Sequence, residues 1–552
     1  MNQALDPVSL RILWSRLMAV ADEAANTLVR TAFSTIARAN DFVCILLDPE
    51  GNSIVANSMG CPAFTGTLPR TMKHVLERYP LERWEPGDVV LTNDPWIGTG
   101  HLPDISMAKP IFFKGQLVAF AGSTSHSPDV GGATFGADAR ELFEEGLRLP
   151  ICRFIKAGRV NEEIVDIIKA NVRVPDQTVG DIFAQVAATD VMAWRLGEFL
   201  EELEEQGEID LSLLGEAIQS RGEAAMRKAL AELPEGVYQD ELETDGTDEG
   251  PIRICLQITI RDGAIEVDYA GTSSQVTRGL NAVMSYTYSH TAFAIKCALD
   301  PHTPNNDGSY RPITVRAPLR SVLNTTFPAP VGGRHLVGHF LSSAVLKCLA
   351  QAAPDRVIAS SSGPPMILIA NGILPEGNRF TQGIWTYGGM GARPDRDGLD
   401  CMPFPGNTRF PSIEWLEHIS PVQILEKRIV PDSGGAGKYR GGCGQQVRFR
   451  IAGDHPVSLS VLSGRVEHPP LGLMGGLPGM PDLIVIEGRG PIDPRGRTVV
   501  YPGEVVVMRW SGGGGYGAPR ERARELVLRD LRYGYITPEA ARTMYGLTDI
   551  QD

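Results

Sequence analysis

The sequence lacks any long apolar run. No stretch of about 18 uninterrupted apolar residues occurs among its 552 residues, so we expect no membrane-spanning helix. The first residues also lack the basic start, apolar middle and small-residue cleavage site of a signal peptide, and they mix apolar with charged side chains instead. We therefore predict a cytoplasmic protein.

Cysteine is sparse and never forms a C-x-x-C pair. The eight cysteines are scattered along the chain, at positions 44, 61, 152, 255, 297, 348, 401 and 443. This spacing excludes a zinc ribbon and a dithiol redox motif, and such dilute cysteine does not fit a disulfide-stabilised scaffold.

Basic clusters are missing as well. The net charge is −14, from 66 acidic and 52 basic residues, and no block of basic residues with interleaved aromatics breaks this balance. An acidic surface repels a phosphate backbone. Nucleic acid is therefore not an expected partner.

Two glycine-rich segments imitate nucleotide-binding motifs without completing them. Residues 433–439 would need glycine at 432 and serine or threonine at 439 to form a phosphate-binding loop, but Asp432 and Tyr439 stand there. Residues 512–517 match G-x-G-x-x-G, yet only residues 518–552 follow, too few for a dinucleotide-binding half. We expect both segments to be structural turns, and we find no nucleophile-elbow serine or Cys–His motif.

What is present predicts an α+β fold with several subdomains. Helical spacing of apolar residues indicates helices at 7–33, 161–172, 179–205, 211–233, 336–352 and 520–545. Strands are expected at 42–47, 52–56, 89–92, 110–122 and within 237–270. The fold class is thus α+β, with mixed sheets, a helical insertion and a β- and glycine-rich C-terminal half.

The same pattern divides the chain into four regions, because 552 residues exceed the size of a single hydrophobic core. Residues 1–160 form an N-terminal α/β region that holds a metal site, and residues 161–235 form a helical region. Residues 236–356 form a mixed α/β region, and residues 357–552 form a β- and glycine-rich region with a C-terminal helical tail.

Two loops concentrate metal-binding side chains. Residues 93–104 supply His101 and Asp104, and residues 123–132 supply His126, in two similarly built H-x-x-D segments. Imidazole and carboxylate groups bind zinc, manganese or ferrous iron, and Asp41 is the best candidate for a fourth ligand. Three or four protein ligands with an open position would make the site catalytic. Spacing alone leaves a simpler interpretation open, in which these polar residues only cap loops.

Several motifs resemble the hydantoinase B/oxoprolinase family. They are Asn93-Asp-Pro-Trp to Asp104-Ile105, His126-Ser-Pro-Asp-Val-Gly-Gly132, Asn305-Asn-Asp-Gly-Ser-Tyr-Arg-Pro312, Phe327-Pro-Ala-Pro330, Asp432 to Gly442 and Gly512 to Tyr516. The likeness extends from about residue 7 to 545. It implies that Asp41, His101, Asp104 and His126 bind a divalent metal, with zinc expected first and manganese or iron as alternatives. Asp94 and Asp129 would serve as base or as orienting groups.

The resemblance also implies a partner and a reaction. Family members work with a hydantoinase A-type subunit whose actin-like site binds ATP with magnesium and activates the small-molecule substrate by phosphorylation. We therefore expect the metal-binding subunit of an ATP-dependent hydrolase of cyclic amides such as hydantoin, oxoproline or lactams, in a heterotetramer or larger assembly. A subunit of an acetone- or acetophenone-type ketone carboxylase and a non-catalytic scaffold are the alternatives.

One position departs from the family pattern. Many relatives carry glutamate three residues before the aspartate of the Asp41-Phe42 step, where this chain has Arg38. Either Arg38 points away from the site, or the substrate carries a different charge.

Overall fold

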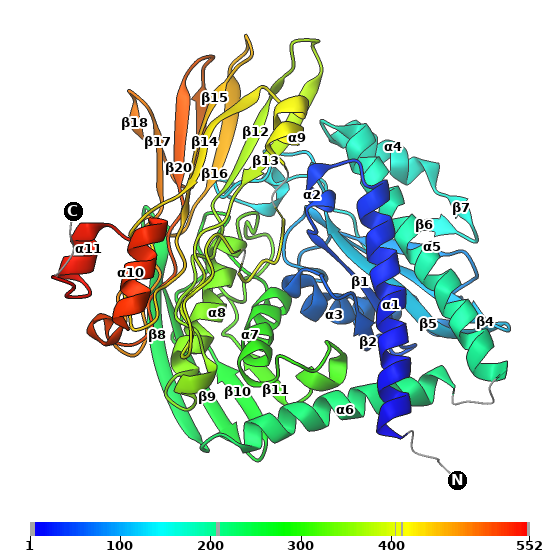
Figure 1. The fold of residues 1–552 in the computed structure, drawn as a ribbon. Helices are drawn as coiled ribbons and strands as arrows, with labels where there is room; N and C mark the ends of the chain where they lie inside the picture. Colours follow the sequence, from blue (N-terminus) through cyan, green and yellow to red (C-terminus); the bar gives the residue numbers. More distant parts are fainter. Residues whose placement is uncertain (1–5, 206–209, 403, 410–411, 549–552) are drawn as a thin grey trace.

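The computed structural model describes residues 6–205, 210–402, 404–409 and 412–548 (Figure 1). Helices and several sheets confirm the expected α+β class. None of the described helices combines the length and apolarity that a bilayer span requires. Among the described residues, five short 3₁₀ turns complete the connections: η1 (Leu81–Arg83), η2 (Leu142–Glu144), η3 (Asp307–Tyr310), η4 (Pro354–Arg356) and η5 (Pro519–Glu521).

A seven-stranded antiparallel sheet organises the N-terminal part, in the order β2-β1-β5-β4-β3-β6-β7. Its strands are β1 (Phe42–Leu47), β2 (Ser53–Ala56), β3 (Val89–Thr92), β4 (Asp104–Phe113), β5 (Gln116–His126), β6 (Cys152–Lys156) and β7 (Arg159–Val160). The helices around it are α1 (Pro7–Thr31), α2 (Thr35–Arg38), α3 (Pro62–Arg78), α4 (Glu162–Asn171) and α5 (Pro175–Glu205). The expected N-cap of α1 is confirmed, because the Asp6 carboxylate accepts from the Val8 and Ser9 amides.

Both faces of this sheet are covered. Alternate β1 residues such as Phe42 and Leu46 join the core shared with α1 and α5, whereas Val43 and Ile45 join the core shared with α3. β1 is therefore a continuous apolar run rather than a half-polar strand, as the burial of all six residues shows.

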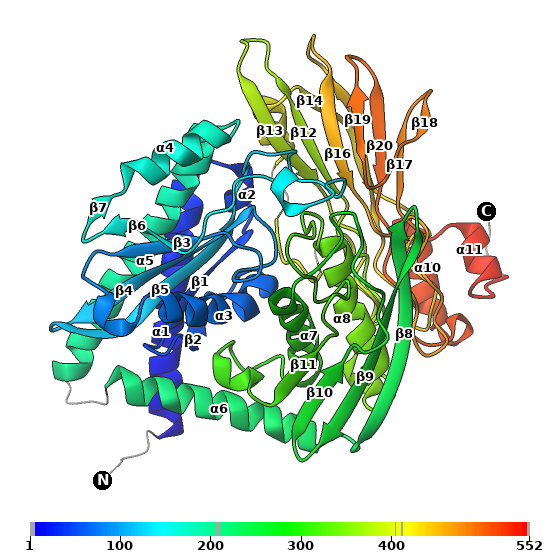
Figure 2. The same ribbon diagram turned by 180° about the vertical axis from the view of Figure 1, so that it is seen from behind.

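The second sheet, β11-β10-β9-β8, forms the central part together with two helices that lie against it (Figure 2). The strands are β8 (Gly236–Thr247), β9 (Gly250–Arg261), β10 (Ala264–Asp268) and β11 (Ile313–Arg316), and the helices are α7 (Met284–Leu299) and α8 (His335–Leu349). The alternating isoleucines of β9, from Ile252 to Ile260, all enter the core, as their spacing predicted.

Helix α6 (Leu211–Ala231) joins the two parts and runs beneath both of them in Figure 1. Leu214 and Ile218 belong to the N-terminal core, whereas Met226 and Leu230 belong to the central core. One amphipathic helix thus fixes the two sheets relative to each other.

Two antiparallel sheets enclose a third core in the C-terminal part. One contains β12 (Ile367–Ile373), β13 (Arg379–Trp385), β16 (Val457–Leu462) and β19 (Arg497–Val500). The other contains β14 (Val422–Ile429), β15 (Gln445–Ile451), β17 (Leu483–Ile486), β18 (Gly490–Pro491) and β20 (Val505–Arg509). Leu368 from the first sheet and Phe449 from the second pack in the same cluster. Helices α9 (Ile413–Ile419), α10 (Arg524–Tyr533) and α11 (Pro538–Thr543) flank this sandwich.

The two glycine-rich motifs pack against each other beside the sandwich. The Gly513 amide donates to Gly442, and the Tyr516 amide donates to Tyr439, both at 2.9 Å. A Cβ on Gly441 would lie 1.9 Å from the Gly513 carbonyl oxygen, so any larger residue would force these backbones apart. Glycine is required here for close backbone packing.

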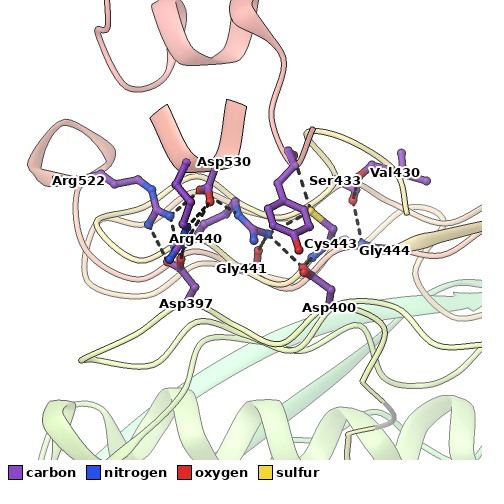
Figure 3. A network of polar contacts seen from close by, with 12 residues as sticks. Asp397, Asp400, Val430, Ser433, Arg440, Gly441, Cys443, Gly444, Arg522 and Asp530 are labelled. Atoms are coloured by element: carbon purple, nitrogen blue, oxygen red, sulfur yellow. Dashed lines mark hydrogen bonds and ion pairs between the residues drawn. The ribbon is translucent and has the colours of Figure 1, made fainter. Parts of the chain in front are cut away.

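A buried ion network fastens α10 to these loops (Figure 3). Arg522 donates to Asp530 and to Asp397, each at 2.6 Å, and Arg440 donates to the Gly441 carbonyl at 2.6 Å. The side chains of Arg522 and Asp530 are fully buried, so each neutralises a charge that would otherwise be strongly destabilising.

Candidate metal centre

The hairpin β4–β5 brings two of the predicted ligands together. Asp104 is the first residue of β4 and His126 the last of β5, and they are direct cross-strand partners. Both residues were expected in loops. They lie in strands because the antiparallel ladder continues to this pair, while His101 remains in the preceding turn.

The same ladder positions Asp41 beside His126. The His126 amide donates to the Asp41 carbonyl oxygen at 3.0 Å, just before β1 pairs with β5. The Asp41 carboxylate lies 3.9 Å from Nδ1 of His126. Four residues from three segments therefore meet at one end of the sheet.

Ligand-type atoms converge closely in this cluster. Oδ1 of Asp104 lies 2.9 Å from Nε2 of His101 and 2.9 Å from Nδ1 of His126. One ligand atom from each of these three residues lies within 4.8 Å of the others. The exposed fractions are 2% for His101, 1% for Asp104 and 7% for His126. Such a group can enclose one ion away from bulk water.

The other oxygen of Asp104 is fully engaged. Oδ2 accepts a hydrogen bond from the Thr99 hydroxyl and pairs with the guanidinium of Arg334. Burial alone would raise the pKa of Asp104, but the Arg334 guanidinium beside Oδ2 helps to hold it well below its usual range. Asp104 is therefore an oriented carboxylate whose Oδ1 faces the two imidazoles.

The tautomer of His101 follows from its hydrogen bond. Nδ1 lies 3.1 Å from the carbonyl oxygen of Gly332, which can only accept, so Nδ1 carries the proton. Burial, followed by the charge of Arg334, lowers the pKa of His101 to about 4, which keeps the ring neutral. Its Nε2 lone pair then points at a carboxylate oxygen and has no hydrogen-bond donor among the described residues.

This arrangement fits a cation. A lone pair and a carboxylate oxygen 2.9 Å apart repel each other unless a positive centre is shared between them. Burial also raises the pKa of Asp41 to about 6, with the charge of Asp104 as a further contribution. Two imidazoles and two carboxylates are a donor set that divalent zinc, manganese or iron accepts.

Glu145 holds the backbone segment that positions His101. Its Oε1 accepts from the amides of Val331 and Gly332, each at 2.7 Å, and so holds the residue whose carbonyl pairs with His101. Burial raises the pKa of Glu145 to about 8. A Cβ on Gly332 would lie 2.6 Å from the Gly136 carbonyl oxygen, which explains the glycine there.

A chamber of about 80 Å³ adjoins the cluster. Its walls combine residues from the N-terminal sheet, from α7 and α8, and from β12 of the sandwich: Ile36, Asp41, Cys61, Ala63, Phe64, His101, Asp104, His126, Phe135, Tyr286, Arg334, His335, His339, Pro365, Ile367, Ile369, Gly406 and Thr408. It therefore lies where the three parts of the molecule meet.

Sequence reasoning missed the residues that α7 and α8 supply. Arg334, His335 and His339 reach the chamber from more than 200 residues beyond the ligand loops, and α7, which carries His290, was not predicted as a helix. A signal was available, because His335 and His339 lie one helical turn apart after two glycines, and histidine occurs only ten times in the chain.

The two predicted catalytic carboxylates lie elsewhere. Asp94 pairs with Arg148 at 2.7 Å and accepts from the Trp96 amide, and Asp129 pairs with Arg173 at 3.0 Å. Neither lines the chamber. Both hold the shape of the ligand-bearing loops, and their action as base or orienting group stays a prediction.

Arg38 points away from the chamber. Its Nε donates to the Ala32 carbonyl at 2.9 Å, and its guanidinium lies 5.1 Å from the Trp415 ring centroid. Ile36 of the same short helix lines the chamber instead. The arginine therefore does not reverse the charge of the site.

Known proteins share this sequence pattern and fold. A family model described as hydantoinase B/oxoprolinase matches residues 6–519. The caprolactamase subunit beta of Pseudomonas jessenii is 30% identical, over 98% of this chain and 96% of its own length. The crystal structure of the ATP-dependent caprolactamase from Pseudomonas jessenii superposes with a TM-score of 0.89, at 28% identity, over 100% of this chain and 97% of that chain.

Two further proteins are similar to this chain over most of its length. The 5-oxoprolinase of Dictyostelium discoideum is 30% identical over 93% of this chain, which corresponds to 40% of that longer protein. A nucleotide-free structure of acetone carboxylase superposes with a TM-score of 0.87, over 98% of this chain and 79% of that one. Its sequence identity is 20%, so this likeness concerns the fold.

Proposed function

The chain belongs to the hydantoinase B/oxoprolinase family, and from this premise we propose that it is the metal-binding subunit of an ATP-dependent cyclic amide hydrolase. The observation that carries the proposal is the buried cluster of His101, Asp104 and His126, with Asp41 beside it, at the wall of a chamber of small-molecule size. A buried cluster of this kind beside a cavity is the arrangement of a reaction site.

In this proposal the four residues hold one divalent ion, with zinc expected first and manganese or iron as alternatives. The ion would supply Lewis acidity toward a substrate oxygen or a water molecule. Arg334 and Thr99 fix the Asp104 carboxylate, and the Gly332 carbonyl fixes the proton of His101 on Nδ1. The apolar residues of the wall would limit the contact of the reacting ring with bulk water.

ATP would be bound by a partner. The relative from Pseudomonas jessenii is named as a subunit, and the Dictyostelium protein contains this unit within a much longer chain. The two glycine-rich motifs of this chain pack closely against each other and are therefore not available to bind a nucleotide. We propose a hydantoinase A-type subunit, with ATP and magnesium, as the source of the activated substrate, in a heterotetramer or larger assembly.

A ketone carboxylase subunit is the second candidate, because the acetone carboxylase fold superposes almost as well as that of caprolactamase. The higher identity and fuller coverage of the caprolactamase favour the hydrolase. A non-catalytic scaffold is the third candidate. A scaffold would give no reason for the buried lone pair of His101 to face the carboxylate of Asp104.

One experiment separates the three candidates. The chain is purified with its ATP-binding partner, its metal content is measured by elemental analysis, and ATP-dependent turnover is tested on hydantoin, lactam and 5-oxoproline and on ketones with labelled bicarbonate. We expect ring opening without carbon fixation. Label fixed into a ketone product would establish the carboxylase instead, and full turnover by a folded, metal-free complex would support the scaffold.

A further inference from the structure

The chamber has a second polar wall that the ligand cluster does not use. His335 and His339 of α8 line it, and their exposed fractions are 4% and 8%. Nε2 of His335 and Nδ1 of His339 have no hydrogen-bond partner among the described residues. Buried polar atoms without partners are costly, so the two imidazoles that line the chamber are suited to a polar occupant that pairs with their ring nitrogens.

This wall belongs to the same space as the ligand cluster. The ring of Phe135, which also lines the chamber, lies 5.4 Å from that of His101, 5.3 Å from that of His126 and 5.7 Å from that of His335. Behind the wall, the ring centroid of His290 from α7 lies 4.8 Å from that of His339, with the two rings tilted by 41°. An occupant could therefore face the ligand cluster and the α8 imidazoles at once.

The wall carries no net charge. Burial lowers the pKa of His339 to about 3 and that of His335 well below its usual range, so both rings are neutral. Among the described lining residues, Arg334 is the single cationic side chain, and it is committed to Asp104, to the Thr99 carbonyl and to the face of Tyr286, 4.0 Å away. A carboxylate on the substrate would find no free cation in this wall.

Size restricts the occupant further. The chamber measures about 80 Å³. Sites for drug-sized ligands measure about 300–1,000 Å³. Most of the remaining wall is apolar, with Phe64 from α3, Ile36 from α2, and Ile367 and Ile369 from β12, and Tyr286 and Thr408 add hydroxyl groups. This space suits one small ring with few polar atoms.

We propose that His335 and His339 form a specificity wall that binds the N–H and C=O groups of an uncharged single-ring amide and disfavours a carboxylate-bearing ring. A neutral imidazole offers one donor and one acceptor, which matches the two polar groups of a cyclic amide. This inference rests on the proposed function for the nature of the reaction, but binding can be measured without turnover.

Binding of ε-caprolactam and of 5-oxoproline is compared by ligand-observed NMR and calorimetry, on the full chain loaded with zinc and in complex with its ATP-binding partner. We expect caprolactam to bind at least about tenfold more tightly than 5-oxoproline, because unpaired buried polar groups reject ligands strongly. Equal or tighter binding of 5-oxoproline, or no binding of caprolactam to the wild-type complex, would overturn the proposal.

Variants assign the effect to the wall. His335→Leu and His339→Leu are each expected to weaken caprolactam binding about tenfold, whereas His339→Gln, which keeps a donor and an acceptor, stays within about threefold of wild type. His455→Leu, at an exposed position far along the sequence, is the matched control. Metal content and circular dichroism must match wild type in every variant. Unchanged binding in both leucine variants refutes the wall.

The hydrolase activity and the specificity wall can be tested separately. If the wild-type complex binds caprolactam through this wall but opens no ring with ATP, the proposed hydrolase is wrong and the specificity wall stands. If the wild-type complex opens rings, and KM for caprolactam is the same in His335→Leu, His339→Leu and wild type, the hydrolase stands and the wall is wrong.

Discussion

Replacing Glu145 with glutamine should stabilise the protein increasingly as the pH rises. Burial raises the pKa of this carboxyl from 4.5 to about 8 in the folded state. An acid with a raised folded-state pKa stabilises the protein fully only below its unfolded pKa, and this stabilisation is lost as the pH rises through the folded value. Wild-type stability should therefore decline between about pH 4.5 and pH 8 because of this group, in the window that the two pKa values define.

The same two pKa values give the size of the stability difference between wild type and Glu145→Gln. A difference of one in pKa corresponds to about 1.4 kcal/mol. The rise in pKa from 4.5 to about 8 therefore means that ionising the buried Glu145 carboxyl above pH 8 costs at most about 5 kcal/mol of folding free energy. Local relaxation and water entry reduce such penalties, and we expect roughly 2 kcal/mol. Glutamine keeps an acceptor for the Val331 and Gly332 amides but cannot ionise.

The assay is thermal unfolding of wild type and Glu145→Gln from pH 5 to pH 9. We expect similar melting temperatures at pH 5 and a growing advantage for the variant toward pH 9. Glu141→Gln, at an exposed position nearby, controls for the loss of a charge. A variant that is less stable than wild type at pH 9, or a difference that does not change with pH, would refute the assignment of a buried, neutral Glu145.

Three other predictions concern the metal and the C-terminal network. His101→Ala and His126→Ala should lose bound metal and ATP-dependent turnover while keeping wild-type circular dichroism; retained metal in either would contradict the ligand assignment. Asp94→Asn removes an ion pair with an arginine and should lower stability by about 1–2 kcal/mol while metal content is kept; a turnover loss of about a thousandfold with unchanged stability would instead show that Asp94 acts in the chemistry. Asp530→Ala leaves Arg522 buried without one of its partners and should cost about 3–5 kcal/mol in urea unfolding. A cost below about 1 kcal/mol would mean that the buried pair matters little for stability.

Local patterns in the sequence determined much of the fold. The helix that starts after Asp6, the β1–β2 hairpin and the alternating isoleucines of β9 depend on neighbours a few residues away, and the structure contains all three. The residue types that form the ligand cluster were equally visible, because two histidines stand out in a chain with only ten.

Tertiary structure decided how these residues are arranged. The ladder register makes Asp104 and His126 cross-strand partners, and Arg334 and Glu145 orient the cluster from distant segments. These contacts join segments separated by up to about 230 residues, and periodicity carries no information over that distance. The same is true of His335, which shares the chamber with the ligand residues although it lies more than 200 residues away in the sequence. The sequence thus determined which groups were available, and long-range packing decided which of them lie buried, neutral and facing one another.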